Sequence, residues 1–181
     1  MKKLKHLCFI TTLAALITVL SISCLAASST TSITLNGITY NYYGRTFTVY
    51  SADTSLSGEV VIPSKIDGHP VVKISYSAFK GCSKITKVII PESITSIASQ
   101  AFENCEMLEE VSIPSTITKI NYALFYNRDS LKSFDFPKYI THIGSAVFSG
   151  CDNLEAINIG KNVSTIDGTA FVKCPKLKKT L

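Results

Sequence analysis

The chain has 181 residues, of which 46% are hydrophobic and 17% are charged, so it can fill a core and is not a disordered polar chain. Its formal charge of +5 comes largely from Lys2, Lys3 and Lys5, because the other residues carry 15 Lys and Arg against 13 Asp and Glu. This near balance argues against a nucleic-acid-binding surface, which needs a clear excess of positive charge.

Residues 1–26 have the three parts of a secretory signal peptide. A basic start is followed by an apolar run from Leu7 to Leu20 and then by small residues, which predicts cleavage after Ala26. The mature chain is then secreted or held at the cell surface. Cleavage before Cys24, with a lipid anchor there, is an alternative, and a retained membrane helix is a third, although the run is short for a bilayer.

Residues 27–62 alternate apolar and polar side chains and predict an N-terminal β cap. Asn36-Gly37 separates two such runs and is typical of a two-residue hairpin turn. The alternation points Tyr40 and Tyr42 inward. The stretch from Lys65 to Pro70 adds residues that later units lack, and we expect it to be a surface loop.

Residues 63–181 repeat with a period of 23 residues, in about five units of which the last is incomplete. Several apolar columns keep this phase, and Arg128 fills the slot that the cysteine column leaves vacant. The columns include Phe79, Phe102, Phe125, Phe148 and Phe171; Cys82, Cys105, Cys151 and Cys174; Ile74, Ile97, Ile120, Ile143 and Ile166; and Pro91, Pro114 and Pro137.

Each unit contains a short run of period two that ends at proline, which lacks the N–H needed to continue a β ladder. A short β-branched stretch and a tight turn then return the chain to the next unit. This pattern predicts a repeat solenoid of the leucine-rich-repeat type, with a parallel β ladder and return segments that are helical, 3₁₀ or β. One unit cannot bury its apolar face alone, so stability must come from stacking.

The run Ile-Pro-x-x-Ile-x-x-Ile-x-x-x-Ala-Phe-x-x-Cys-x-x-Leu, from Ile90 to Leu108, resembles the BspA-type leucine-rich repeat of bacterial surface proteins. The resemblance covers about residues 60–181; Leu124 and Arg128 depart from the motif. Members of the family are mostly exported, and some adhere to host matrix or plasma proteins. The resemblance therefore implies a non-enzymatic scaffold that binds a protein of the host or cell surface.

Three surfaces are candidates for binding. The first is the outward side of the repeated strands, which we call the strand face: Lys87, Ile89, Glu110, Ser112, Ser133, Asp135, Ala156 and Asn158. The second is a Tyr and Arg group in the irregular third unit, with the composition of an interface hot spot: Tyr122, Tyr126, Arg128 and Tyr139. The third is a carbohydrate- or wall-binding module that would use the cap residues Tyr40, Tyr42, Tyr43 and Tyr50.

The sequence contains no catalytic or phosphate-binding motif, and we expect neither cofactor nor metal. We expect His69 and His142 to be ordinary surface residues, and the acidic residues to form solvated columns, Glu109 with Lys132 and Glu155, and Lys87 with Glu110. The cysteine spacing is the repeat period, which favours free buried thiols. Bridges between Cys82 and Cys105 or between Cys151 and Cys174 stay open as an alternative.

At the C-terminus the sequence stops in the middle of an expected strand. Lys176, Lys178 and Lys179 could blunt an exposed edge, a partner or a second copy could cover it, or the chain could be an incomplete gene product. The sequence does not decide between these interpretations.

Overall fold

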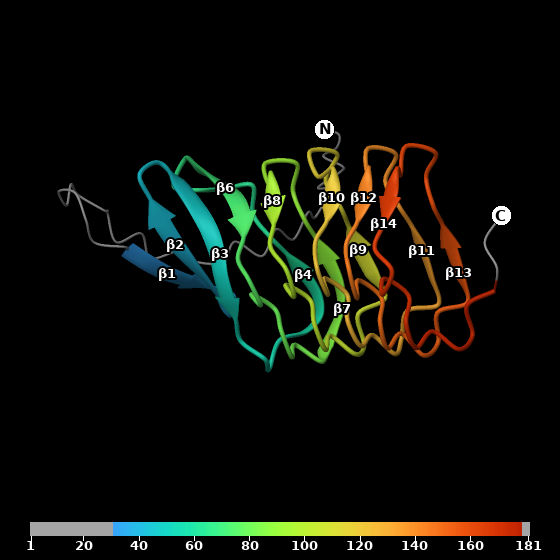
Figure 1. The fold of residues 1–181 in the computed structure, drawn as a ribbon. Coiled ribbons are helices and arrows are strands. Elements are labelled where there is room, and N and C mark those ends of the chain that lie inside the picture. The colour runs from blue at the N-terminus through green and yellow to red at the C-terminus, as the bar shows by residue number, and fades with distance from the viewer. Residues whose placement is uncertain (1–30, 179–181) are drawn as a thin grey trace, which may run out of the picture.

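A computed structural model describes residues 31–178, which form a β solenoid preceded by a β hairpin (Figure 1). The predicted signal peptide, the candidate anchor at Cys24 and the edge residue Lys179 lie outside the described residues. The strands are β1 (Thr31–Leu35), β2 (Ile38–Tyr43), β3 (Thr46–Ala52), β4 (Ser57–Val61), β5 (Lys65–Ile66), β6 (His69–Ile74), β7 (Lys84–Ile89), β8 (Ser96–Ile97), β9 (Glu110–Ser112), β10 (Lys119–Ile120), β11 (Ser133–Asp135), β12 (His142–Ile143), β13 (Ala156–Asn158) and β14 (Thr165–Ile166).

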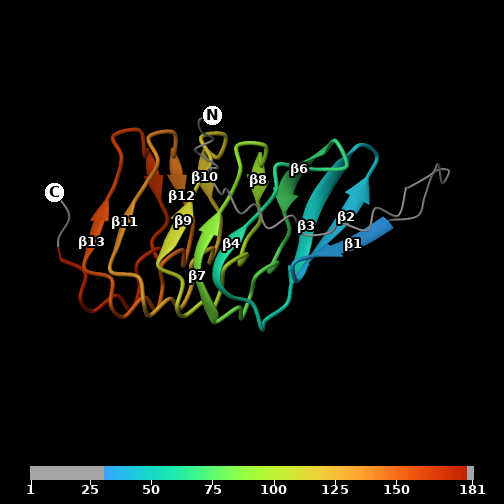
Figure 2. The same ribbon diagram turned by 180° about the vertical axis from the view of Figure 1, so that it is seen from behind.

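Each coil crosses the solenoid twice. The longer strands, β4, β7, β9, β11 and β13, lie on the side nearer the viewer in Figure 2, and the short strands β8, β10, β12 and β14 lie on the side nearer the viewer in Figure 1. The paired strands on each side are parallel, and in the regular units residues 23 positions apart face each other, such as Lys87 with Glu110 and Lys119 with His142. The predicted parallel ladder is therefore confirmed.

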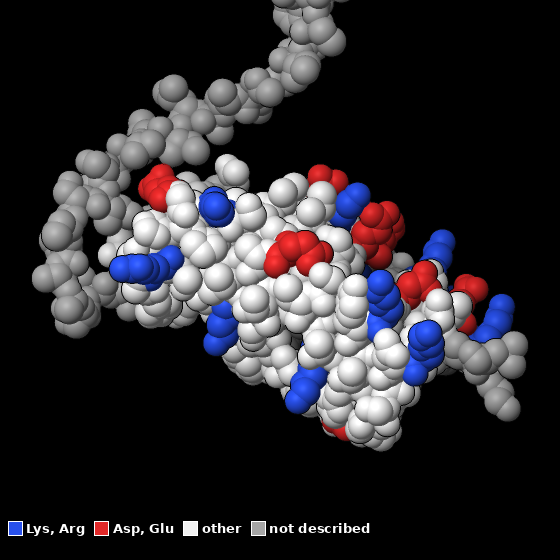
Figure 3. Space-filling view, turned by 90° about the horizontal axis from the view of Figure 1, so that it is seen from above, with Lys and Arg blue, Asp and Glu red and all other residues white. Residues whose placement is uncertain are grey.

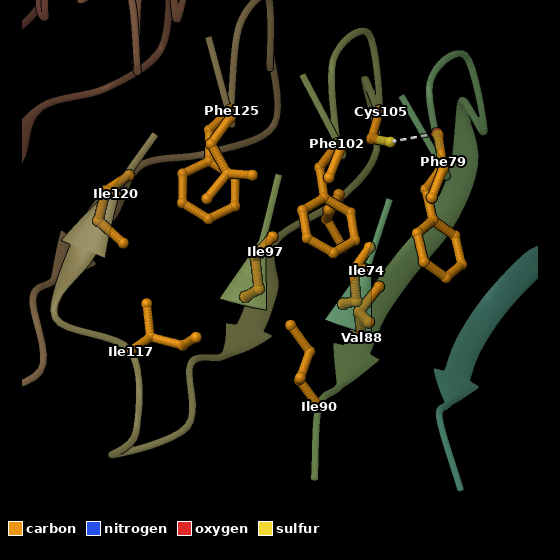
Figure 4. Packing of buried hydrophobic residues seen from close by; sticks show 14 of the residues in the cluster. Ile74, Phe79, Val88, Ile90, Ile97, Phe102, Cys105, Ile117, Ile120 and Phe125 are labelled. Atoms are coloured by element: carbon orange, nitrogen blue, oxygen red, sulfur yellow. Dashed lines mark hydrogen bonds between the residues drawn. The ribbon is translucent and has the colours of Figure 1, made fainter. Parts of the chain in front are cut away.

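The five repeated phenylalanines form a file through the core, as predicted. Successive ring centroids are 5.3, 6.0, 5.4 and 5.7 Å apart from Phe79 to Phe171. Figure 4 shows three of these rings above the isoleucine columns, pointing into the same interior. The first four rings are fully buried, so each coil completes the apolar wall of its neighbour.

The return segments contain no helix anywhere in residues 31–178, so the helical alternatives are wrong and the β alternative is confirmed. Two residues in each of the turns that follow β6, β8, β10 and β12 have positive φ, for example Gln100 at 58° and Asn104 at 57°, whereas the turn after β14 has one, Lys173. A right-handed helix cannot pass through left-handed residues. Their N–H groups instead donate across to the next coil, as Gln100 does to the Tyr122 carbonyl and Asn104 to the Tyr126 carbonyl, both at 3.0 Å. Within this stretch, no helix is long and apolar enough to cross a membrane.

The cap forms as predicted around Asn36-Gly37, where β1 and β2 pair antiparallel and both turn residues have positive φ. Strand β3 then pairs in parallel with β6, which joins the cap to the solenoid. The insertion from Lys65 to Pro70 is not an irregular loop: β5 and β6 pair antiparallel across Asp67-Gly68. Burial of Ile66 against the core explains why this segment is ordered.

The last described coil covers its apolar column only in part. Ile166 is 43% exposed, and Phe171 and Leu177 are only half-buried. Lys176 donates to the Asn153 amide oxygen at 2.5 Å, and Lys178 lies 4.0 Å from the Glu155 carboxylate. These lysines therefore bind the preceding coil.

Candidate functional site

The strand face is assembled as the alternation predicted. Its residues lie on β7, β9, β11 and β13, with Ile89 opposite Ser112 and Asp135 opposite Asn158. Lys87 and Ile89 are half-buried, whereas the six other members are exposed. The face thus spans two sheets, β4-β7-β9 and β11-β13, and half of its residues have short polar side chains.

Lys87 organises the charges at the N-terminal end of this face. Its ammonium lies 3.2 Å from the Glu110 carboxylate and 3.6 Å from the Glu59 carboxylate. The hydrogen bond and charge of Glu110, with a contribution from Glu59, raise the pKa of Lys87 above its ordinary value. All three groups are exposed to solvent, so this cluster orders the surface more than it stabilises the fold.

A shallow depression of about 270 Å³ lies on the strand face, and it is lined in part by Glu110, Ser112, Ser133 and Asp135. It coincides with a break in the ladder, because β9 belongs to the β4-β7-β9 sheet and β11 to a separate sheet with β13. The expected column of Glu109, Lys132 and Glu155 keeps its register between Lys132 and Glu155, whose N–H donates to the Lys132 carbonyl at 2.8 Å, but its ion pairs are not formed. No ion pair joins these residues in the described chain, and Glu155 approaches Lys178 instead.

We attribute the break to bulky side chains in the third unit. Phe134 and Phe136 replace aliphatic residues of the neighbouring coils, and both pack against Phe148. Arg128 replaces cysteine, and its guanidinium carbon lies 4.8 Å from the centre of the Phe125 ring. These larger groups hold the two coils apart where the ladder would otherwise continue.

The second candidate surface is not assembled. Arg128 is fully buried, and its Nε donates to the Leu108 carbonyl at 3.0 Å. Tyr139 lies in the turn between β11 and β12, whereas Tyr122 and Tyr126 lie in the turn after β10, at the opposite end of the coil. The prediction placed these residues together because sequence proximity does not show at which end of a coil a turn lies.

Two of the four tyrosines of the third candidate surface point into the protein. Tyr40 is buried, and burial raises the pKa of its hydroxyl. Tyr42 is half-buried and packs against Phe47 at 5.0 Å between ring centroids. The inward orientation of these two residues is confirmed, and only Tyr43 and Tyr50 remain exposed.

The four cysteines in residues 31–178 are free thiols, and each contacts a carbonyl of an earlier coil or of the cap, as Cys105 Sγ contacts the Phe79 carbonyl at 3.1 Å (Figure 4). Burial raises the pKa of the Cys105 and Cys151 thiols to about 12. Thiols with such high pKa values are poor nucleophiles and metal ligands. The cysteine column therefore packs the core.

His69 and His142 are half-buried, and within residues 31–178 neither forms a hydrogen bond with a Ser, Thr or Cys side chain. His69 packs edge-on against Tyr42, and His142 Nε2 lies 3.7 Å from the Asp167 carboxylate, which accepts a hydrogen bond from Ser145. No group of three or more His, Cys, Asp or Glu in residues 31–178 is arranged to hold a metal ion.

Charged side chains of both signs are interspersed on the surface seen from above, and neither sign forms a continuous patch there (Figure 3). Sequence reasoning missed Tyr76, which is 61% exposed. The 23-residue period could have found it, since Tyr76 shares a column with Ser99 and Tyr122.

The fold and the strand face define the class of protein, a leucine-rich-repeat solenoid. The model of the BspA type leucine rich repeat region matches residues 52–178 with six copies. The chain therefore belongs to the BspA-type leucine-rich-repeat family. A comparison with curated proteins yields no match.

Solved bacterial structures share the fold. A leucine-rich cell surface protein of Faecalibacterium prausnitzii is 29% identical with a TM-score of 0.77, over 82% of this chain and 38% of that one. The Treponema pallidum leucine-rich-repeat protein is 28% identical with a TM-score of 0.73, over 83% and 71%. A leucine-rich-repeat protein of Bacteroides ovatus is 28% identical with a TM-score of 0.62, over 82% and 46%. This chain thus spans less than half of two of these relatives.

Proposed function

We propose that this chain is an exported, non-enzymatic scaffold whose strand face binds a protein partner at the cell surface. The observation that carries the proposal is the depression at the ladder break, which interrupts an otherwise regular polar sheet within the strand face. The signal-peptide pattern of residues 1–26 and the similarity to a cell surface protein support export.

The chemistry of the face fits a polar protein surface. Glu110 and Asp135 offer carboxylates, Ser112 and Ser133 offer hydroxyls, and the half-buried Ile89 supplies an apolar contact. Only about five coils contribute, so the contact area is at the small end for protein complexes and the affinity is modest. Partner binding therefore depends on a few residues near the depression.

The test replaces Ile89 and Asp135 together by lysine. A library of displayed protein domains, selected on the wild-type chain, supplies the partner, and its Kd is measured for both chains by surface plasmon resonance. We expect at least roughly a tenfold loss of affinity, because the apolar contact and one carboxylate are removed and two positive charges are added. The thermal unfolding midpoint should not change, since Asp135 is exposed and Ile89 is half-buried at the surface.

A matched control places lysines on the opposite side of the solenoid, as Ser96→Lys with Thr165→Lys. Both positions are exposed, and their column already contains Lys119. The control variant should bind like the wild-type chain. Unchanged affinity of the Ile89 and Asp135 variant, or equal loss in the control, would reject the strand face as the binding site.

A further inference from the structure

A row of exposed tyrosines lies at the end of the short strands, away from the strand face. Tyr50, Tyr76 and Tyr122 are 55%, 61% and 53% exposed, and we call them the tyrosine strip. Tyr76 and Tyr122 lie in the turns that follow β6 and β10, at the lower edge of the solenoid in Figure 1. None of the three is covered by another element in residues 31–178.

The register of the solenoid sets the spacing of the strip. Tyr76, Ser99 and Tyr122 occupy the same position in three successive coils, so the two rings stand two strand spacings apart, or roughly 10 Å. Tyr50 lies at the cap end of the row but one position off the column, because Val49 faces Ile74 in the β3 and β6 ladder and Tyr50 therefore comes opposite Ser75. Ser99 places only a small side chain in the column between the two rings, and Gln100 of the same coil binds the Tyr76 hydroxyl.

Polar contacts fix one ring of the strip. The Tyr76 hydroxyl donates to Gln100 Oε1, and Gln100 Nε2 donates to the Glu103 carboxylate. Lys80 holds the other oxygen of that carboxylate at 3.1 Å. Tyr76 is therefore preorganised, which lowers the entropic cost of binding a ligand.

The column itself and the positions on either side of it carry no formal charge over four coils, although Gln100 binds the Glu103 and Lys80 pair and Ser145 binds Asp167. The position before each column member, the member itself and the position after it are all uncharged: Ser75, Tyr76, Ser77, Ala98, Ser99, Gln100, Asn121, Tyr122, Ala123, Gly144, Ser145 and Ala146. Asn121 donates to the Ile97 carbonyl at 2.6 Å through its NH₂ group, which leaves its amide oxygen available. This surface matches a neutral ligand rich in hydroxyl groups.

We propose that the tyrosine strip binds a neutral β-1,4-linked glycan along the solenoid axis. The ring spacing of roughly 10 Å, two strand spacings, suits a chain in which every second sugar meets a ring. The apolar face of each of those sugars stacks on Tyr76 or Tyr122, and the hydroxyl groups between them bond to Ser99 and Asn121. The site shares only Tyr50 with the cap surface considered from the sequence.

The experiment titrates the purified chain with chitohexaose and cellohexaose by isothermal titration calorimetry. We expect weak one-site binding of at least one of them, and roughly a tenfold loss of affinity in Tyr76→Ala and in Tyr122→Ala, since each removes one stacking contact. Tyr76→Phe should retain most of the affinity because it keeps the ring. All three side chains are at the surface, so the variants should unfold at the wild-type temperature.

Tyr139→Ala is the matched control, because Tyr139 is exposed but lies in a turn at the other end of its coil. It should bind the oligosaccharides like the wild-type chain. Absence of binding to both hexasaccharides, or equal losses in the control and strip variants, overturns the proposal. The variant with Ile89→Lys and Asp135→Lys should bind the oligosaccharides like the wild-type chain. The proposal of a glycan site and the proposal of a protein-binding strand face are therefore tested independently.

Discussion

Arg128 is the residue at which this solenoid departs most from its own repeat. Its guanidinium is fully buried, donates to the Leu108 carbonyl through Nε and Nη2, and leaves Nη1 without a hydrogen-bond partner. No carboxylate of residues 31–178 forms an ion pair with it, and burial lowers the pKa of Arg128 to about 10. A buried cation without an anion destabilises a fold, so this residue weakens the third unit.

We predict that Arg128→Met raises the free energy of unfolding at pH 7 by about 1–3 kcal/mol. Methionine fills a similar volume without a charge, and this gain exceeds the loss of the bond to Leu108. Urea unfolding followed by circular dichroism measures the difference, with Arg45→Met, at an exposed position in the cap, as control. A lower stability of Arg128→Met would contradict the prediction.

The same variant should show a specific pH dependence. The pKa of Arg128 is lower in the folded chain than in the unfolded chain, so the unfolded chain binds more protons above about pH 10. The wild-type chain therefore gains stability relative to Arg128→Met as the pH rises through about 10, and carries the full penalty below it. The stability difference between the two chains should shrink between pH 9 and 11.

The phenylalanine file is the element that couples one coil to the next. Phe102 lies between Phe79 and Phe125, with ring centroids 5.3 and 6.0 Å away, and has no exposed surface. Phe171 ends the file, with one neighbour at 5.7 Å and a partly exposed ring. The contribution of a repeated phenylalanine to the free energy of unfolding therefore depends on its place in the stack.

We predict that Phe102→Ala lowers the free energy of unfolding by about 3–5 kcal/mol, because it leaves a cavity between two rings that cannot collapse. Phe171→Ala makes the same chemical change at the open end and should cost less than half as much. Urea denaturation of both variants tests the comparison. Equal losses would show that the file does not couple the coils.

The whole molecule is a stack in which each coil contacts only its neighbours, so its stability should vary along the axis. Central coils have buried columns on both sides, whereas the last described coil leaves Ile166 and Phe171 partly exposed. Opening therefore costs least at the C-terminal coil.

Amide hydrogen exchange measures this gradient. The Phe102 N–H, bonded to Leu124 at 3.2 Å, should exchange more slowly than the Asp167 N–H, bonded to Ile143 at 2.9 Å. If bond length alone set the exchange rate, the Asp167 N–H would exchange more slowly than the Phe102 N–H. The comparison therefore distinguishes the effect of position in the stack from that of local hydrogen-bond geometry. Faster exchange at Phe102 would contradict nearest-neighbour stacking as the source of stability.

The periodic residues by themselves determined the architecture. A 23-residue spacing of Phe and Ile can be buried only if the coils stack in register, Asn36-Gly37 suits a tight hairpin, and proline stops each long strand. Alternation within a strand also placed the strand face, because successive side chains point to opposite sides of a sheet.

Only the tertiary structure decided what happens in the turns and in the irregular unit. The left-handed positions hold residues such as Ser77, Gln100 and Ala123, which give no local signal because contacts with the neighbouring coils select their conformation. Arg128 has the composition of a surface residue, yet the cysteine slot draws it inside, and the ladder opens beside it. Tyr76 and Tyr122 are far apart in sequence and lie in one column because stacking aligns the coils in space.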